Sequence, residues 1–166
     1  MKNRCNVIIA TLVLVFAVAL PQGNCAPKGY MSVIGMQGES LSSSCLGCID
    51  ILTATEGQLN GERIVVVTKL IDRSSIEWRI LSALGDVLPE VTIQFYTGGE
   101  LNFKFWEIKL LDVEVKSVTM KASAGERRPA EKIELIPGKI KWTYVPQRAD
   151  GTIGTEVTGS FDYKTD

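Results

Sequence analysis

Cys45 and Cys48 are the residues whose types and spacing point most directly to chemistry, because they form a C-x-x-C pair. Such a pair exchanges thiols and disulfides when it begins a helix, since the helix N-terminus lowers the thiol pKa. Here residues 49–52 alternate apolar and polar side chains, as a strand does. We therefore predict a local structural disulfide in a loop, with free thiols and a redox pair as the alternatives.

Catalysis and metal binding through other residues have little support in this sequence. Histidine is absent, and it is the commonest general base and the commonest nitrogen ligand of metals. A zinc site at the cysteine pair would need two further ligands. Asp112 and Glu114 lie two apart on an expected strand, a spacing typical of a solvated polar face. We expect a protein that is not an enzyme and that binds no cofactor and no metal.

Aromatic side chains on expected strands offer a different kind of site. A platform for stacking sugars would be formed if they gathered on one face, as in a binding module. Aromatic residues on strands more often belong to a core or to an interface, and we favour that interpretation. The residues concerned are Tyr96, Trp106, Trp142 and Tyr144.

The apolar pattern predicts a mainly β structure around these positions. Residues 49–55, 63–70, 91–95 and 140–144 have the alternation or the β-branched composition of strands. Residues 39–48, which are rich in serine, predict a loop. Turn signals separate the later strands: Gly98-Gly99 between two alternating runs predicts a hairpin, and Asp150-Gly151 predicts a turn.

The long run after the Gly98-Gly99 hairpin does not keep one apolar phase. Its phase slips at Phe105–Trp106, at Leu110–Leu111 and between Val115 and Val118. A flat strand keeps its phase, because successive side chains alternate between two faces. We therefore predict bulges, or strands that bend from one sheet into another. Further on, Pro137-Gly138 taken alone predicts a turn.

One short helix is expected at about residues 75–84. Ser74 and Glu77 have the spacing of a capping box, and Gly85 can end the helix. Between them, four apolar residues fall on one helical face, which is the pattern of a helix packed on a core. These residues are Ile76, Ile80, Ala83 and Leu84.

The N-terminal segment has the three-part layout of a secretory signal peptide. A short positive region precedes an uncharged run at residues 7–20, and small residues surround the expected cut after Cys25. The run is shorter than the roughly 20 residues that span a membrane. We expect residues 1–25 to be a signal peptide or N-terminal hydrophobic segment, and 28–166 to be one domain. The product would be secreted or periplasmic, with no stable membrane span after processing.

Composition narrows the partners. The chain has 166 residues, 45% of them hydrophobic and 22% charged, which fits one ordinary globular domain. Its formal net charge is -1, and neither tail is basic. A nucleic-acid partner is therefore not expected.

Several stretches, taken in order, suggest a family. In one of them a strand leads through Lys69-x-x-Asp72 to a helix cap at Ser74 and Ser75. The stretches are residues 36–40 (MQGES), 49–52 (IDIL), 67–75 (VTKLIDRSS), 106–120 (WEIKLLDVEVKSVTM) and 131–147 (EKIELIPGKIKWTYVPQ). Their order and spacing, across about residues 30–166, resemble the haemolysin-coregulated protein (Hcp) family, the tube protein of bacterial type VI secretion.

The resemblance implies a structural, secreted protein. It implies a small β-barrel or two-sheet fold with one helix, assembly into hexameric rings, and stacking of rings into a tube capped by a spike protein. Such rings carry small effector proteins and have no active site. Tube-forming relatives have a long glycine-rich loop that touches the next ring, where this chain has only about residues 56–62. In the family fold, Pro137-Gly138 would be a bulge at a sheet edge. The alternative is a free-standing periplasmic or extracellular binding module of the same fold.

Overall fold

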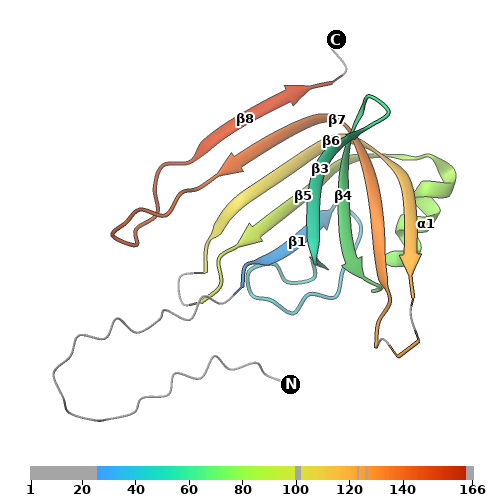
Figure 1. Cartoon of the computed structure of the whole chain (residues 1–166), viewed down its shortest axis with the longest axis horizontal. Coiled ribbons are helices and arrows are strands. Elements are labelled where there is room, and N and C mark those ends of the chain that lie inside the picture. Colours follow the sequence, from blue (N-terminus) through green and yellow to red (C-terminus); the bar gives the residue numbers. More distant parts are fainter. Residues whose placement is uncertain (1–25, 100–101, 123, 126, 164–166) are drawn as a thin grey trace.

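The chain forms one curled antiparallel sheet with a helix against its side (Figure 1). The computed structural model describes residues 26–163 apart from 100, 101, 123 and 126, so the predicted signal peptide lies outside the described residues. The elements are β1 (Lys28–Val33), β2 (Ile49–Ile51), β3 (Thr53–Leu59), β4 (Glu62–Leu70), α1 (Ser75–Leu84), β5 (Val87–Tyr96), β6 (Lys104–Lys121), β7 (Ala130–Tyr144) and β8 (Val157–Asp162).

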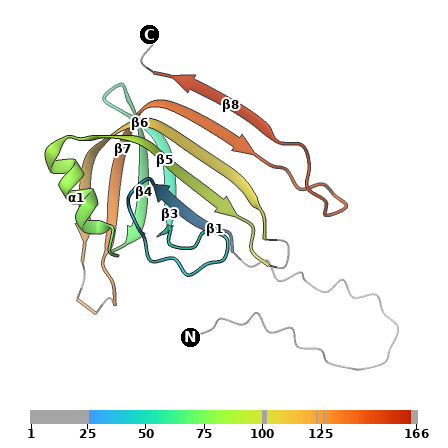
Figure 2. The same cartoon turned by 180° about the vertical axis from the view of Figure 1, so that it is seen from behind.

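The strand order makes the sheet curl back toward itself. It runs β2-β1-β5-β6-β7-β4-β3, and β8 pairs with β7 off this path. The two ends of the path, β2 and β3, are consecutive in the chain. Between them the amide of Leu52 donates to the Thr68 carbonyl of β4 at 2.8 Å. Figure 2 shows the resulting half-barrel from behind, with α1 beside it. The expected fold, mainly β with one short helix, is confirmed.

Each of the three phase slips in β6 coincides with an irregularity of the strand. Phe105 is an extra residue, because Phe95 pairs with Trp106 while Tyr96 pairs with Lys104. Asp112 has a positive φ of 50°, and burial changes there from one phase to the other. The ladder with β7 shifts again between Val115 and Ser117. Bulges are therefore confirmed at the first and third slips, whereas at Asp112 both ladders keep their register and only the backbone conformation is irregular.

The turn and the bulge predicted at Pro137-Gly138 are both wrong. β7 runs through these residues, and Pro137 lies opposite Val113 of β6 without a change of register. On its other side β7 pairs with β4 through residues 130–135 and with β8 through residues 139–144. The proline therefore sits at a fork where the two neighbouring strands separate. A residue without an N–H fits there because no ladder hydrogen bond is required of it.

Helix α1 has the predicted bounds but a different packing face. Trp78 is fully buried, whereas the residues predicted to face the core are exposed: Ile76, Ile80, Ala83 and Leu84. Gly85 ends the helix at a φ of 71°, as predicted. The helix packs on the core through Trp78 and the partly buried Leu81. A stripe of aliphatic residues does not by itself say which face of a helix meets the core.

The predicted capping box at Ser74 is also wrong. Ser74 occupies the N-cap without a side-chain cap hydrogen bond. Its hydroxyl instead donates to Oδ1 of Asp72 at 2.6 Å, because a carboxylate is a stronger acceptor than the alternatives nearby.

Asp112 and Glu114, the spaced acidic pair, are both exposed. Among the described residues, no helix has the length and apolar composition to cross a membrane.

Candidate functional site

A buried ammonium group, that of Lys69, lies where β4 meets the start of α1. Lys69 comes near the end of a strand whose inward residues are valines, and its own exposed fraction is 0%. Its Nζ lies 2.6 Å from Oδ1 of Asp72 and 2.9 Å from Oε1 of Glu131. It also donates to Oγ of Ser75 at 3.1 Å. A buried charge is tolerated only when it is paired and hydrogen-bonded in this way.

Glu131 is the second centre of this network. The Ser75 hydroxyl donates to its Oε1 at 2.6 Å, and the Arg79 guanidinium donates to its Oε2 at 2.7 Å. Burial raises the pKa of Glu131, but the hydrogen bonds from Ser75, Lys69 and Arg79 outweigh that effect and hold the pKa below its usual value. The carboxylate is therefore ionised, and it joins the first residues of β7 to α1.

Asp72 completes the network at the turn before the helix. Its Oδ1 accepts from the backbone amide of Ser74 at 2.9 Å as well as from the Ser74 hydroxyl. Its own amide donates to Oγ of Ser75 at 3.0 Å. The four family-motif positions, Lys69, Asp72, Ser74 and Ser75, thus lie together. Their polar atoms bond to one another, so the arrangement fixes α1 on the sheet and leaves Lys69 closed to a substrate.

Two members of the network were missed from the sequence, Glu131 and Arg79. Glu131 shares the inward face of β7 with Ile133 and Leu135, and all three are buried. A single carboxylate in the apolar phase of a strand was the available signal, since such a group needs a buried partner. Arg79 lies one helical turn after Ser75 and also donates to the Ser75 carbonyl at 2.7 Å. That spacing is common on any helix, so it gave no comparable signal.

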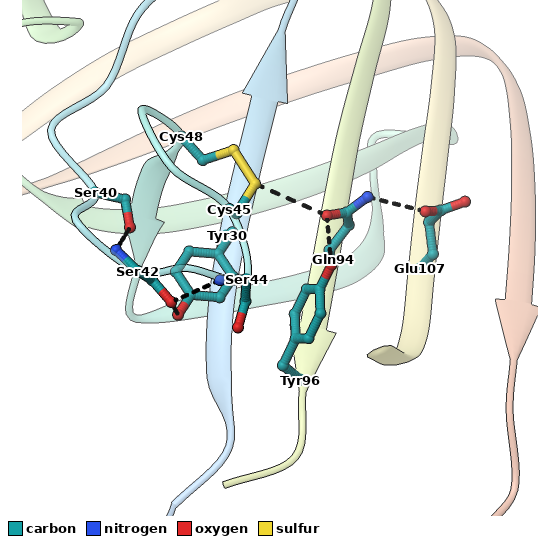
Figure 3. The surroundings of a disulfide bond; sticks show 9 residues. All are labelled: Tyr30, Ser40, Ser42, Ser44, Cys45, Cys48, Gln94, Tyr96 and Glu107. Atoms are coloured by element: carbon teal, nitrogen blue, oxygen red, sulfur yellow. Dashed lines mark hydrogen bonds between the residues drawn. A yellow bond between two sulfur atoms is a disulfide. The ribbon is translucent and has the colours of Figure 1, made fainter. Parts of the chain in front are cut away.

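A second polar cluster surrounds the cysteine pair, which the structure joins as a disulfide (Figure 3). The loop before β2 is folded on itself by backbone hydrogen bonds. Gly38 donates to the Gly47 carbonyl at 2.8 Å, and Ser40 donates to the Cys48 carbonyl at 2.9 Å. A Cβ at Gly38 would lie 2.2 Å from that same Cys48 oxygen, so only glycine fits. We call residues 37–48 the disulfide loop.

The surroundings of the disulfide differ from those of a thiol enzyme. Cys45 and Cys48 occupy successive turns, where the Cys48 amide donates to the Cys45 carbonyl, and not the first turn of a helix. Oε1 of Gln94 lies 3.9 Å from the Cys45 sulfur, and the Gln94 amide donates to Glu107 at 3.0 Å (Figure 3). An acceptor oxygen backed by a carboxylate does not stabilise a thiolate. The geometry therefore favours a structural disulfide over a redox pair.

The disulfide loop and the ionic network are neighbours. Oε1 of Glu39, in the loop, accepts from the backbone amide of Arg73 at 3.0 Å. Oε2 of Glu39 pairs with Arg128 at 3.0 Å, and Gln37 accepts from the Arg73 guanidinium at 3.0 Å. Arg73 follows Asp72 directly. The loop is therefore attached to the turn that positions α1.

The four aromatic residues singled out in the sequence do not form one platform. Tyr96 meets Tyr30 edge to face, with ring centroids 5.7 Å apart. Trp106 and Tyr144 contact each other at 6.1 Å. Trp142 is separate: it lines a cavity of about 300 Å³ between the β3–β4 hairpin and β8.

The comparisons with known proteins agree on one family. The model of the family described as "Type VI secretion system effector, Hcp" matches residues 30–144. Protein hcp1 of Pseudomonas aeruginosa is 33% identical over 85 residues, which are 51% of this chain and 52% of that protein. The chain thus matches about half the length of this curated relative.

Solved structures extend the likeness over most of the fold. Hcp1 from Salmonella typhimurium matches with a TM-score of 0.76 at 22% identity, over 86% of this chain and 98% of that one. A structure described as a type six secretion system protein matches with a TM-score of 0.77 at 25% identity, over 84% and 98%. With the family model covering β1 to β7 on this fold, the chain belongs to the Hcp family of type VI secretion.

Proposed function

We propose that this chain is a non-catalytic structural protein that assembles into rings like those of the type VI secretion tube. The observation that carries the proposal is the family match over residues 30–144, which spans the helix and the curled sheet apart from β8. The ionic network supports it, because its charged groups hold one another in place and serve the position of α1. A subunit of this kind acts through its surfaces, so those surfaces decide how it assembles.

The exposed side of α1 is the surface best suited to meet another copy. Ile76, Ile80 and Leu84 are 64%, 50% and 67% exposed, and their spacing of four residues places them in one row. We call this row the α1 outer face. Aliphatic side chains in a continuous exposed row favour a protein contact, unlike isolated ones. The Lys69–Glu131 pair holds the helix at its first turn, so the row is presented in a fixed direction.

Strand edges offer a second means of contact. In the described part of the chain β8 pairs with β7 alone, and β3 pairs with β4 alone. The outer edge of β8 therefore presents backbone groups that a neighbouring chain can bind. Rings close when one patch meets a different patch on the next copy. An edge at β8 and a helix face at α1, on different parts of the curl, suit such a contact (Figure 1).

The short β3–β4 hairpin argues against the stacking of rings. The β3–β4 connection is a two-residue turn at Asn60 and Gly61, with φ values of 53° and 89°, which is the pattern of a tight hairpin. The hairpin also bends toward β7, where Glu56 accepts from the Trp142 indole at 2.9 Å. Such a short element has little reach toward a second ring. We therefore propose single rings, with the spike protein and small effector proteins as the further partners implied by the family.

Export is the remaining part of the proposal. Residues 1–25 would direct the chain to the general export pathway, and the mature protein would be periplasmic or extracellular. An oxidising compartment of that kind is where a disulfide such as Cys45–Cys48 persists. N-terminal sequencing of the exported protein should give Ala26 as its first residue, and an intact Met1 on exported protein would contradict the proposal.

Sedimentation velocity and native mass spectrometry on the purified chain test the ring. We expect a discrete hexamer at micromolar concentration, because a ring of six is what the family implies. Electron microscopy of the same sample should show separate rings and no long tubes. A strict monomer at high micromolar concentration would contradict the ring and favour the free-standing binding module.

A further inference from the structure

The fork between β4 and β8 holds a cavity that is partly open to solvent. One cavity of about 300 Å³ lies between the β3–β4 hairpin and the strands β7 and β8. A second, of about 540 Å³, lies on the other side of the fork and shares Arg63, Pro137, Phe161 and Tyr163 with the first. Volumes of this size are typical of sites for small ligands.

The walls of the first cavity combine aromatic rings with groups that bind hydroxyls. Trp142, Phe161 and Tyr163 line it from β7 and the region of β8, and the last two rings contact at a centroid distance of 4.9 Å. Glu56 and Arg63 line it from the hairpin. Apolar faces beside a few polar side chains are the usual composition of a ligand site.

The indole of Trp142 has a fixed orientation and one open face, as a stacking platform requires. Its Nε1 donates to both carboxylate oxygens of Glu56, at 3.0 and 2.9 Å, so its polar edge is already bonded. Gly159 lies directly opposite it on β8. A Cβ on that glycine would approach the indole to 4.0 Å, which is ordinary contact, so the absence of a side chain leaves the ring open.

The charges of the cavity select a neutral ligand. The Glu56 carboxylate repels an anionic ligand, and the Arg63 guanidinium repels a cationic one. Together, the carboxylate accepts hydrogen bonds from hydroxyl groups and the guanidinium donates hydrogen bonds to them. Burial raises the pKa of Tyr163, and Glu56 adds to that effect against the opposing charge of Arg63. The phenol is therefore a neutral donor. A pyranose ring has the matching chemistry, with an apolar C–H face and a rim of hydroxyls.

We propose that this cavity binds one neutral hexose unit of a glycan, with the Trp142 indole as the stacking face. Glu56 accepts hydrogen bonds from the sugar hydroxyls, and Arg63 and Tyr163 donate to them. The proposal goes beyond the ring function, and glycan binding is measured separately from ring assembly. If the chain binds no glycan, the ring proposal is unaffected, and if the chain forms no ring, the glycan proposal is unaffected.

A printed array of neutral glycans, followed by calorimetry with maltohexaose, cellohexaose and mannohexaose, tests this site on the purified chain. We expect at least one of these glycans to bind, with a change in tryptophan fluorescence. Trp142→Ala should weaken binding about tenfold or more, because the largest apolar contact is lost. Gly159→Leu should abolish it by covering the indole. Trp106→Ala, which alters an aromatic residue outside the cavity, is the matched control.

Gly159→Leu keeps the test valid if Trp142→Ala does not fold, since it adds a side chain at an exposed position with no positive φ. The site assignment is overturned if no glycan binds at millimolar concentration. It is also overturned if binding survives both cavity variants, or if an extended peptide binds at these residues and no glycan does.

Discussion

At the scale of single residues, the pairing of Lys69 with Glu131 decides whether α1 is held on the sheet. Both side chains have an exposed fraction of 0% and lie 2.9 Å apart. Removing one partner leaves the other charge buried without compensation, which typically costs about 3–5 kcal/mol. We predict that Lys69→Met lowers the free energy of unfolding by about that amount, measured by urea denaturation.

The double variant Lys69→Met with Glu131→Leu distinguishes pairing from simple loss of packing. It should recover part of the lost stability, because no buried Glu131 carboxylate then lacks its lysine, whereas Asp72 and Arg79 each still lose one ion pair. Lys139→Ala is the control, since Lys139 forms its 2.7 Å contact with Asp162 at the surface and should change stability far less. Equal losses in the control and in Lys69→Met would contradict the special role of the buried pair.

Glu131 also makes stability depend on pH. Its folded pKa is below the usual value of 4.5, so its contribution is present above about pH 4.5 and is lost as the pH falls through the folded pKa. Protonated glutamate resembles glutamine. We therefore predict that the stability gap between the native chain and Glu131→Gln is constant from pH 7 to about pH 5 and narrows below it. Urea midpoints across this range measure the gap, and one that widens in acid would contradict the assignment.

At the scale of elements, the disulfide loop is a brace for the turn before α1. Its bridge spans three positions, so the loop-closure contribution is small, about 2 kcal/mol. We predict that Cys45→Ser with Cys48→Ser keeps the fold and raises hydrogen exchange in residues 37–48 and at Arg73. The same variant separates bracing from redox chemistry. An insulin-reduction activity that the native chain has and the variant lacks would contradict a structural role.

The sequence predicted those features of the elements that alternation determines. The slips in β6 were visible because a strand has a strict period of two, and Asp112 and the neighbouring bulges lie where the phase changes. The bounds of α1 followed from its apolar period and Gly85. The packing face of α1 could not be predicted in this way. Whether Trp78 or Ile80 is buried depends on which surface the curled sheet leaves open to the helix.

Residues distant in sequence set the limit of prediction for the candidate sites. Lys69 and Asp72 are close in the chain and could be grouped from the sequence. Glu131 reaches them only because β4 and β7 pair in the observed register. The Trp142 cavity likewise requires the fork at Pro137, where β4 and β8, which are far apart in the sequence, separate. A single sequence can mark Glu131 as a group that needs a buried partner, but it does not say which residues meet at either site.

At the scale of the whole molecule, the α1 outer face and ring assembly are linked. The row stays exposed although the core of the curl is apolar. Ring formation would bury this row against a neighbouring copy. We predict that Ile80→Glu converts the ring to monomers, because a buried carboxylate without a partner is unfavourable. Sedimentation velocity measures the shift, and circular dichroism should stay unchanged since Ile80 is 50% exposed.

Ile153→Glu provides the comparison that makes this result specific. Ile153 is exposed to a similar degree, 54%, but it lies in the connection between β7 and β8 and not on the helix. The same change of charge at this second isoleucine should leave the ring intact. If both variants dissociate, net repulsion explains the effect. If neither dissociates, the ring is built from strand edges such as β8, and the exposed row on α1 has another partner.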